Sequence, residues 1–349
     1  MSAIGACIYR FGGDVAARLV LLRPHVLVVG EGCWNDLPAI AASCPPGCIF
    51  ILRDMSDNLI DQDAGTVAWK IHLVSAANPG LDCVLHALNE SYGDAGRARA
   101  WELRFLDACD AIGEAACCLN GAYGNDPDPS FEAIARRAYL IGWHGYEGWA
   151  EDVGQWVDPN YTVFRYRHNR PEVRWPTWWD EVRWKHVMTE VGFESFPGTG
   201  QRRGWRDMGL SEGDVQQRVL QNALEFVADG GAGQCSFTLG HTEQSWEEGY
   251  GTTEAMLRAW GTLGPPFVLQ APESTPTPDP GPPNGGAMPD YVLGIKAKAD
   301  ALGAAIVGEP EHDEASIPIG DGKVLTLQKS TKGLFVYVTG GSVSFLPGL

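Results

Sequence analysis

The chain has 349 residues, of which 44% are hydrophobic, and its formal net charge is -18. This length and apolar content allow one large domain and a smaller one. An acidic surface repels phosphate backbones, so we expect no nucleic-acid partner, whereas a neutral substrate is compatible with it. No apolar run approaches the roughly 20 residues needed to span a bilayer, so we expect no membrane span.

The N-terminus, MSAIGACIYRFGGD, reads as an early strand and lacks the charged-then-apolar order of a secretory signal. We therefore favour a cytoplasmic or phage-associated protein, although a mature chain whose signal had been removed would look the same. Of the nine cysteines, Cys7, Cys83, Cys117, Cys118 and Cys235 fall in apolar runs that we interpret as core strands. A free thiol packs in such places as a small hydrophobe. The oligomeric state is not indicated.

Eight short apolar runs recur along the large N-terminal unit, and segments with helical periodicity lie between most of them. The runs are Ile4–Tyr9, Val26–Gly30, Cys48–Leu52, Cys83–Leu88, Ala115–Asn120, Leu140–Trp143, His186–Glu190 and Gln234–Leu239. The helical segments are Gly96–Ile112, Pro129–Ala138, Ser211–Ala228 and Thr252–Trp260. This alternation indicates parallel βαβ units, and eight of them predict an α/β fold, a (β/α)8 TIM barrel over residues 1–268. An open doubly wound sheet would usually carry a glycine-rich first turn, which is absent.

A segment rich in Pro and Gly follows the barrel and predicts a linker over residues 269–289. Residues 290–349 are then expected to form a small α+β accessory domain, possibly for targeting, with one helix and three strands. These elements are Tyr291–Leu302, Lys323–Gln328, Gly333–Val338 and Ser342–Phe345. A small domain tethered in this way can raise the local concentration of substrate.

The carboxyl ends of the strands hold the candidate catalytic groups, because the active site of a barrel enzyme lies at that face. The fourth strand leads into Asn89 and Glu90, and the seventh ends in Glu190. These two strands lie across the barrel from each other, so the two carboxylates face one cavity. Cleavage of a glycosidic bond needs such a pair, one carboxyl as acid and one as nucleophile. The alternative is that both are solvated carboxylates at strand ends.

This arrangement resembles the clan A superfamily of retaining glycoside hydrolases, in which an Asn-Glu pair ends strand four and a Glu ends strand seven. The resemblance implies that Glu90 is the general acid/base, that Glu190 is the nucleophile and that Asn89 hydrogen-bonds the sugar 2-hydroxyl. In the same family an aromatic or His residue often follows strand six, and His144 and Tyr146 take that place here.

The family also often has a Trp after strand eight that forms the floor of the sugar-binding site, and Trp246 is the candidate for this role. Arg53, at the end of strand three, is expected to orient the nucleophile, although the family's arginine is more usual on strand two. Glu147, in an aromatic run after strand six, is the main rival carboxylate and a candidate sugar ligand. Trp178 and Trp179 lie in a Trp-rich stretch, where such rings either stack on sugar faces or pack the loop onto the barrel.

No cofactor or metal is expected. His144 and His241 come from separate strands and lack the spacing of a histidine metal motif. Cys44 and Cys48 flank a Pro-Pro-Gly turn, but no second pair with zinc-like spacing accompanies them. The chain also has no Gly-rich phosphate loop and no nucleophile elbow.

The sequence therefore predicts a retaining glycoside hydrolase acting on a polysaccharide or a cell-surface or cell-wall glycan. The C-terminal module resembles small domains appended to phage-encoded or bacterial cell-wall-acting hydrolases. Two alternatives stay open: a non-catalytic glycan-binding or virion structural protein built on a glycosidase-like barrel, and a muramidase-type lysin. Digestion of peptidoglycan would separate the last of these from the first.

Overall fold

The computed structural model describes the backbone of residues 2, 4–56, 58–86, 88, 95–121, 129–150, 155–157, 181–193, 204–206, 208–228, 230–241, 251–262, 315–320, 323–330, 333–338 and 344–347. Side chains are described in these ranges except at 120–121, 129, 147–150 and 155–157 and in the C-terminal strands from 315 onward.

Eight parallel strands form a closed ring. In order around it they are β1 (Ile4–Ile8), β2 (Val26–Gly30), β3 (Ile49–Arg53), β4 (Asp82–His86), β5 (Ala115–Gly121), β6 (Leu140–Ala150), β8 (His186–Phe193) and β9 (Gly233–Gly240). The ring closes because β9 pairs with β1 and β5 pairs with β6, all in parallel. The fold is a (β/α)8 barrel, as the alternation of apolar runs and helical segments predicts.

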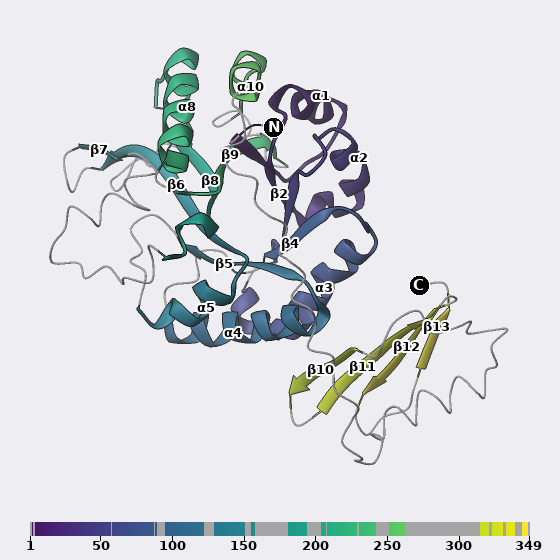
Figure 1. Cartoon of the computed structure of the whole chain (residues 1–349). Helices are drawn as coiled ribbons and strands as arrows, with labels where there is room; N and C mark the ends of the chain where they lie inside the picture. Colours follow the sequence, from purple (N-terminus) through teal and green to yellow (C-terminus); the bar gives the residue numbers. More distant parts are fainter. Residues whose placement is uncertain are drawn as a thin grey trace.

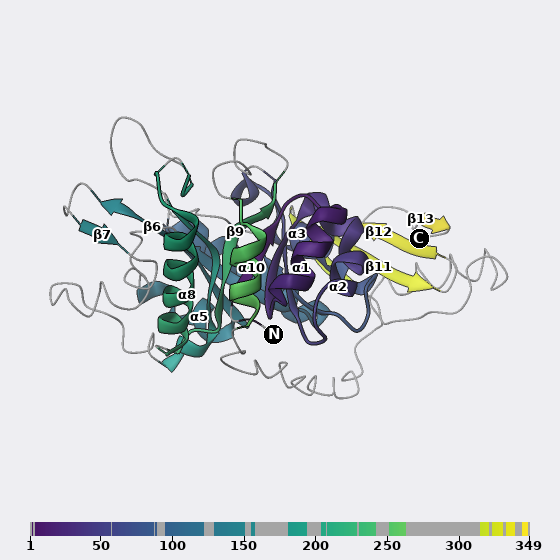
Figure 2. The ribbon, with the colours of Figure 1, turned by 90° about the horizontal axis from the view of Figure 1, so that it is seen from above.

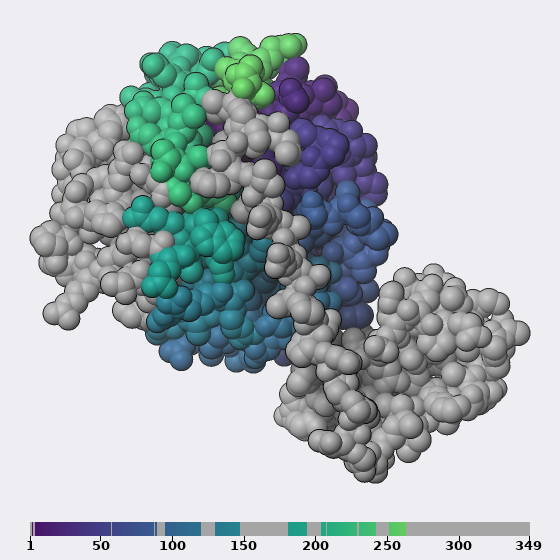
Figure 3. Space-filling view, in the orientation of Figure 1, coloured from purple at the N-terminus to yellow at the C-terminus, as the bar shows by residue number. Residues whose placement is uncertain are grey.

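Helices surround the ring of strands (Figure 1). They are α1 (Gly13–Leu22), α2 (Leu37–Ala42), α3 (Ala64–Ala76), α4 (Ala95–Ile112), α5 (Glu132–Arg137), α8 (Glu212–Ala228) and α10 (Glu254–Gly261). Short 3-10 turns occur at Glu31–Asp36, Leu59–Asp61, Pro129–Phe131 and Arg183–Lys185. Figure 2 shows α8, α10 and α1 side by side, and in Figure 3 the end of the barrel, α10, lies against its beginning, α1.

Two apolar clusters follow from the alternation of side chains along each strand. One cluster is drawn from the strands and the residues next to them, so it fills the interior of the barrel; it includes Cys7, Val28, Ile51, Val84 and Cys117. The other joins the outward-facing strand residues to the helices. The interior of the barrel below the carboxyl-end face is therefore closely packed with apolar side chains. Polar side chains at that face lie directly on this packed layer.

The sixth strand is longer than its sequence predicts. The apolar run was expected to end at Trp143, but β6 continues to Ala150 and forms an antiparallel hairpin with β7 (Gln155–Val157). The extension is glycine-rich and reads as a loop in isolation, yet it pairs with β8 as far as Glu147. Pairing with a neighbouring strand here overrides the local preference of the sequence. In the same way β8 runs past Glu190 to Phe193.

The C-terminal region contains a four-stranded antiparallel sheet in the order β10 (Ala315–Gly320), β11 (Lys323–Ser330), β12 (Gly333–Val338) and β13 (Ser344–Pro347). The three expected strands are present, and β10 is an addition. The linker, the domain boundaries and the helix expected at Tyr291–Leu302 lie outside the described residues and stay predictions. Within the described residues, no helix has the length and apolar character required to cross a membrane.

Candidate active site

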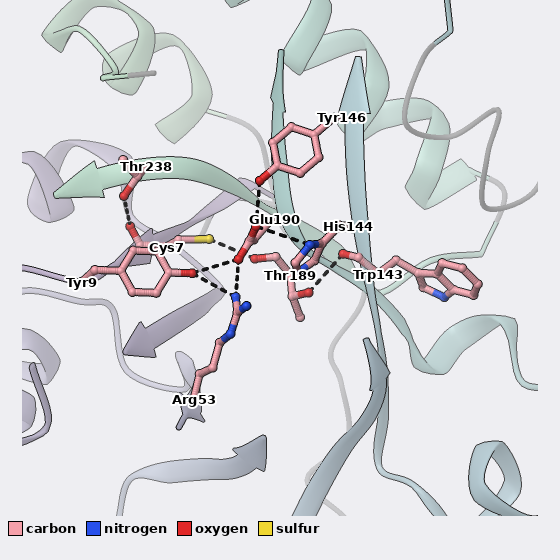
Figure 4. A network of polar contacts seen from close by, with 9 residues as sticks. All are labelled: Cys7, Tyr9, Arg53, Trp143, His144, Tyr146, Thr189, Glu190 and Thr238. Atoms are coloured by element: carbon pink, nitrogen blue, oxygen red, sulfur yellow. Dashed lines mark hydrogen bonds and ion pairs between the residues drawn. The ribbon is translucent and has the colours of Figure 1, made fainter. Parts of the chain in front are cut away.

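Glu190 is the centre of a buried polar network at the carboxyl-end face of the barrel (Figure 4). Its side chain is only 8% exposed, and its partners come from the ends of other strands rather than from its own. Figure 4 shows Tyr9 and Arg53 on one side of the carboxylate and Tyr146 and His144 on the other. The network thus spans the barrel, and closure of the ring is what brings these four residues together.

A strand irregularity turns Glu190 toward the interior. On β8, Val187 faces the interior cluster, whereas Met188 and Val191 face the helices. Strict alternation would send residue 190 outward with Met188. The pairing register shifts between Met188 and Val191 against β9, and the adjacent Thr189 hydroxyl donates to the Trp143 carbonyl of β6, 3.0 Å away. Such a bulge re-aims a side chain, and here it delivers the carboxylate into the barrel.

Arg53 and Tyr9 engage one oxygen of the carboxylate. The Arg53 guanidinium makes a close ion pair with Glu190 Oε1, and the Tyr9 hydroxyl donates to the same oxygen at 3.0 Å. Arg53 Nη1 also donates to the Tyr9 hydroxyl oxygen at 3.0 Å, so the three groups form a closed triangle. Arg53 is the last residue of β3, and the structure places it against the expected nucleophile although the family's arginine more usually sits on strand two.

Tyr146 and His144, both on β6, face the other oxygen. The Tyr146 hydroxyl donates to Glu190 Oε2 at 2.7 Å, and His144 Nδ1 lies 3.4 Å from the same oxygen. Both residues are buried. These are the two side chains that the sequence places after strand six, and β6 carries them because it is longer than expected.

The surroundings keep Glu190 ionised. Burial alone would raise the pKa of the carboxyl group, but attraction from His144 and Arg53 and the hydrogen bonds from Tyr146 and Arg53 outweigh it and lower the pKa to about 2. Burial and the charge of Glu190 raise the pKa of Tyr9 well above its ordinary value, so Tyr9 stays a neutral donor. The site therefore presents a fixed negative charge with ordered donors on both oxygens.

His86 extends this polar layer and has no counterpart among the residues to which the sequence gives a role. It ends β4 directly beside Arg53 in the strand register, and it is 1% exposed. Its Nδ1 lies 3.1 Å from the Cys117 carbonyl. Tyr9 was likewise interpreted only as the end of a core strand. The rule that located Arg53, a polar residue closing an apolar strand, would have identified both.

Aromatic rings line one side of the network. Phe237 of β9 lies between Tyr9 and Tyr146, with ring centroids 5.9 and 6.4 Å away. His241, the residue after β9, packs edge-on against Tyr9 at 5.2 Å. These rings give the carboxylate an apolar neighbour on the β9 side, which the sequence did not single out.

Two other strand-end acids serve a different purpose. Asp54 and Glu31, which follow β3 and β2, both bind the ammonium group of Lys70 on α3, at 3.0 and 2.7 Å. Asp54 also accepts a hydrogen bond from the backbone of Ser56. Their carboxylates are thus used to fix the loops after these two strands.

Several predicted site residues cannot be compared with this network. Glu90, Asn89, Trp246, Trp178 and Trp179 lie outside the described residues. For Glu147 only the backbone is described, paired with Phe193 of β8. The expectation that the two catalytic carboxylates face one cavity therefore stays a prediction.

The cysteines and histidines offer no metal cluster in the part of the chain that the structure describes, where no group of three or more His, Cys, Asp or Glu side chains could hold an ion. All nine cysteines are free thiols, and the five assigned to core strands are buried or partly buried. Three of them belong to the apolar cluster that fills the interior of the barrel: Cys7, Cys117 and Cys235.

No protein-family profile matches the chain, and no curated protein sequence matches it. Among solved structures, the YdjI aldolase from Escherichia coli K12 aligns with 74% of this chain and 86% of its own at 13% identity and a TM-score of 0.35. An amidohydrolase from Pseudomonas aeruginosa aligns with 76% and 91% at 10% identity and a TM-score of 0.37. These scores carry no functional argument. The closed ring of parallel strands defines the fold as a (β/α)8 barrel, with a buried polar network at its carboxyl-end face.

Proposed function

We propose that the barrel is a retaining glycoside hydrolase in which Glu190 is the nucleophile and Glu90 the general acid/base. One observation carries the proposal: a carboxylate held ionised and oriented at the carboxyl-end face, where barrel enzymes have their active sites. A nucleophilic carboxylate must be charged to attack the anomeric carbon. The network supplies that charge at any pH above about 2.

The chemistry assigns a separate task to each carboxyl group. Glu90 donates a proton to the leaving oxygen while Glu190 attacks the anomeric carbon, and the glycosidic bond breaks as a glycosyl ester forms. Water then attacks the anomeric carbon, Glu90 takes its proton, and Glu190 leaves as the carboxylate. Arg53, Tyr9 and Tyr146 orient the nucleophile for attack.

The experiment is mechanism-based trapping. The protein is first screened on 4-nitrophenyl glycosides and on polysaccharides, including cell-wall preparations, to find the sugar it cleaves. The matching 2-deoxy-2-fluoro glycoside with a dinitrophenyl leaving group should then add one fluorosugar to the protein, on the peptide that contains Glu190. Adduct formation on another carboxylate, such as Glu147, would show that Glu190 is not the nucleophile.

Matched variants support the same test. Glu190→Gln keeps the shape of the side chain but removes its charge, so turnover should fall by at least about a thousandfold. Glu254→Gln makes the same change on an exposed residue of α10 and should leave turnover unchanged. Glycan binding without turnover in the wild-type protein would support the non-catalytic alternative, and digestion of peptidoglycan alone would support the muramidase.

A further inference from the structure

Two buried polar atoms at the barrel mouth have no partner within the described residues. They are the Nε of Arg53 and the Nε2 of His86. Both side chains are 1% exposed. A buried polar atom left without a hydrogen bond destabilises a protein, and most such atoms in native structures have a protein or water partner.

Arg53 and His86 are neighbours because they are paired on adjacent strands of the barrel. Arg53 ends β3 and His86 ends β4, and the strand register pairs them directly. Paired residues of parallel strands point to the same face of the sheet. Because Arg53 reaches Glu190 across the interior, His86 points to the interior as well. Burial is the main cause of the low pKa of His86. The charge of Arg53 lowers this pKa further, which accords with the proximity of the two residues.

The two atoms differ in what they require. Arg53 Nε carries a hydrogen and can only donate. His86 Nδ1 faces the Cys117 carbonyl at 3.1 Å, and a carbonyl can only accept, so the ring proton is on Nδ1 and Nε2 presents a lone pair. Its pKa of about 3 keeps the ring neutral, so Nε2 remains an acceptor.

We propose that Arg53 Nε and His86 Nε2 together bind one hydroxyl oxygen, which accepts from Arg53 and donates to His86. A carboxylate or a phosphodiester could accept from Arg53 but has no proton for His86. An ammonium group could donate to His86 but would be repelled by Arg53. A hydroxyl group satisfies both atoms, and its two sources are a hydroxyl of the sugar substrate and an ordered water. The substrate arm rests on the proposed glycosidase function, whereas the water arm does not.

The first test is nitrogen NMR of the full-length protein with 15N-labelled histidine, which distinguishes a hydrogen-bonded Nε2 from a free one. The His86 signal is assigned by its loss in His86→Phe. A signal already shifted in the free protein, and unmoved by added monosaccharides, identifies water. A signal that moves with one monosaccharide but not with its monodeoxy analogue identifies the sugar hydroxyl. A signal typical of a free Nε2 under all conditions overturns the proposal.

The second test uses a cleavable aryl glycoside and its monodeoxy analogue lacking the bound hydroxyl. If the sugar occupies the site, His86→Phe should reduce kcat/KM for the parent glycoside by about tenfold or more and leave kcat/KM for the analogue nearly unchanged. Equal losses on both substrates would show a structural role and overturn the sugar arm. If no glycoside is cleaved, the proposed function fails, but the NMR signal of His86 still decides whether a hydroxyl oxygen is bound.

Discussion

At the scale of single residues, the donors around Glu190 set its charge. Tyr146 is a neutral donor to Oε2, 2.7 Å away, and its hydrogen bond is one of the causes of the low pKa of Glu190. Removing such a bond destabilises the charged form more than the neutral one. A hydrogen bond to a charged group is worth about 1.5–3 kcal/mol, which corresponds to one or two pH units in the pKa of the acceptor.

We therefore expect Tyr146→Phe to raise the pKa of Glu190 by about one pH unit or more. The variant keeps the ring that packs against Phe237 and removes only the hydroxyl. The measurement is a carbon NMR titration of 13C-labelled glutamate, followed where a substrate is known by the acidic limb of kcat/KM, which should move to higher pH. Tyr139→Phe, on a half-buried tyrosine before β6, is the control. An unchanged Glu190 titration would show that Arg53 and His144 suffice.

The residue scale is also where the sequence was least informative. Glu190, Arg53, His144 and Tyr146 could be selected by their place near strand ends, and the structure brings all four together. The inward direction of the Glu190 side chain could not be predicted, because it depends on a bulge that breaks the alternation of side chains along β8. Tyr9 and His86 follow or end strands in the same way, but a tyrosine or histidine after apolar residues reads equally well as core. Only the ring closure reveals which polar strand ends face each other.

At the scale of elements, close strand packing explains a glycine that no turn requires. Gly5 lies within β1, and a Cβ atom built there would approach the Val26 carbonyl oxygen of β2 to 1.8 Å and the Cys235 sulfur of β9 to 3.2 Å. A contact of 1.8 Å with backbone cannot be relieved by a side-chain rotation. The strands must move apart, and their neighbours in a closed ring oppose that movement.

Gly5→Ala should therefore lower the free energy of unfolding by about 1–3 kcal/mol or more, as overpacking does in other cores. Gly13→Ala is the matched control, because a Cβ atom at Gly13, the first residue of α1, meets nothing within 4 Å. That variant should be neutral or slightly stabilising, since alanine favours helix. Urea unfolding at pH 7.5 measures both. Equal stabilities for the two variants would contradict the packing described for β1.

The sequence predicts the positions of the strands better than it predicts the arrangement of the site residues. All eight barrel strands begin within a residue or so of their expected positions, because a strand buried on both faces gives a continuous apolar run that helices interrupt. The prediction failed where pairing rather than composition decides, in the extension of β6, in β7 and in β10. A polar, glycine-containing segment forms a strand only when a neighbour offers backbone groups, and the sequence does not state which neighbour that is.

At the scale of the whole molecule, buried histidines couple folding to pH. The pKa of His86 falls to about 3 through burial and the charge of Arg53, and burial also lowers the pKa of His25. In the unfolded chain a histidine titrates near about 6.5. Below that pH the unfolded state binds protons that the folded state does not. The part of the stability that these two histidines contribute is therefore complete above about pH 6.5 and declines as the pH falls toward about 3. Glu102 acts in the opposite direction between about pH 4.5 and pH 7, because burial raises its pKa to about 7.

Between pH 7 and pH 5 we expect His86 to lower the free energy of unfolding by up to about 1.4 kcal/mol per pH unit of acidification, opposite in sign to the contribution of Glu102. His86→Phe should lack that decrease, so the difference in the free energy of unfolding between wild type and variant should change by that amount per pH unit, and His25→Phe should remove a separate contribution. Urea titrations at constant ionic strength provide the slopes. Parallel curves for wild type and His86→Phe would mean that His86 is protonated to the same extent in both states.

The ion pair between Arg53 and Glu190 has a further consequence under the proposed chemistry. When Glu190 becomes a glycosyl ester, its charge disappears, while Arg53, still 1% exposed, keeps its own. A buried cation without a counter-ion is strongly unfavourable. Under the proposed chemistry, loss of the ion pair raises the free energy of the covalent intermediate, and departure of the carboxylate restores the pair. Under that chemistry the arginine that orients the nucleophile also favours hydrolysis of the ester, so one ion pair would serve both the formation and the breakdown of the intermediate.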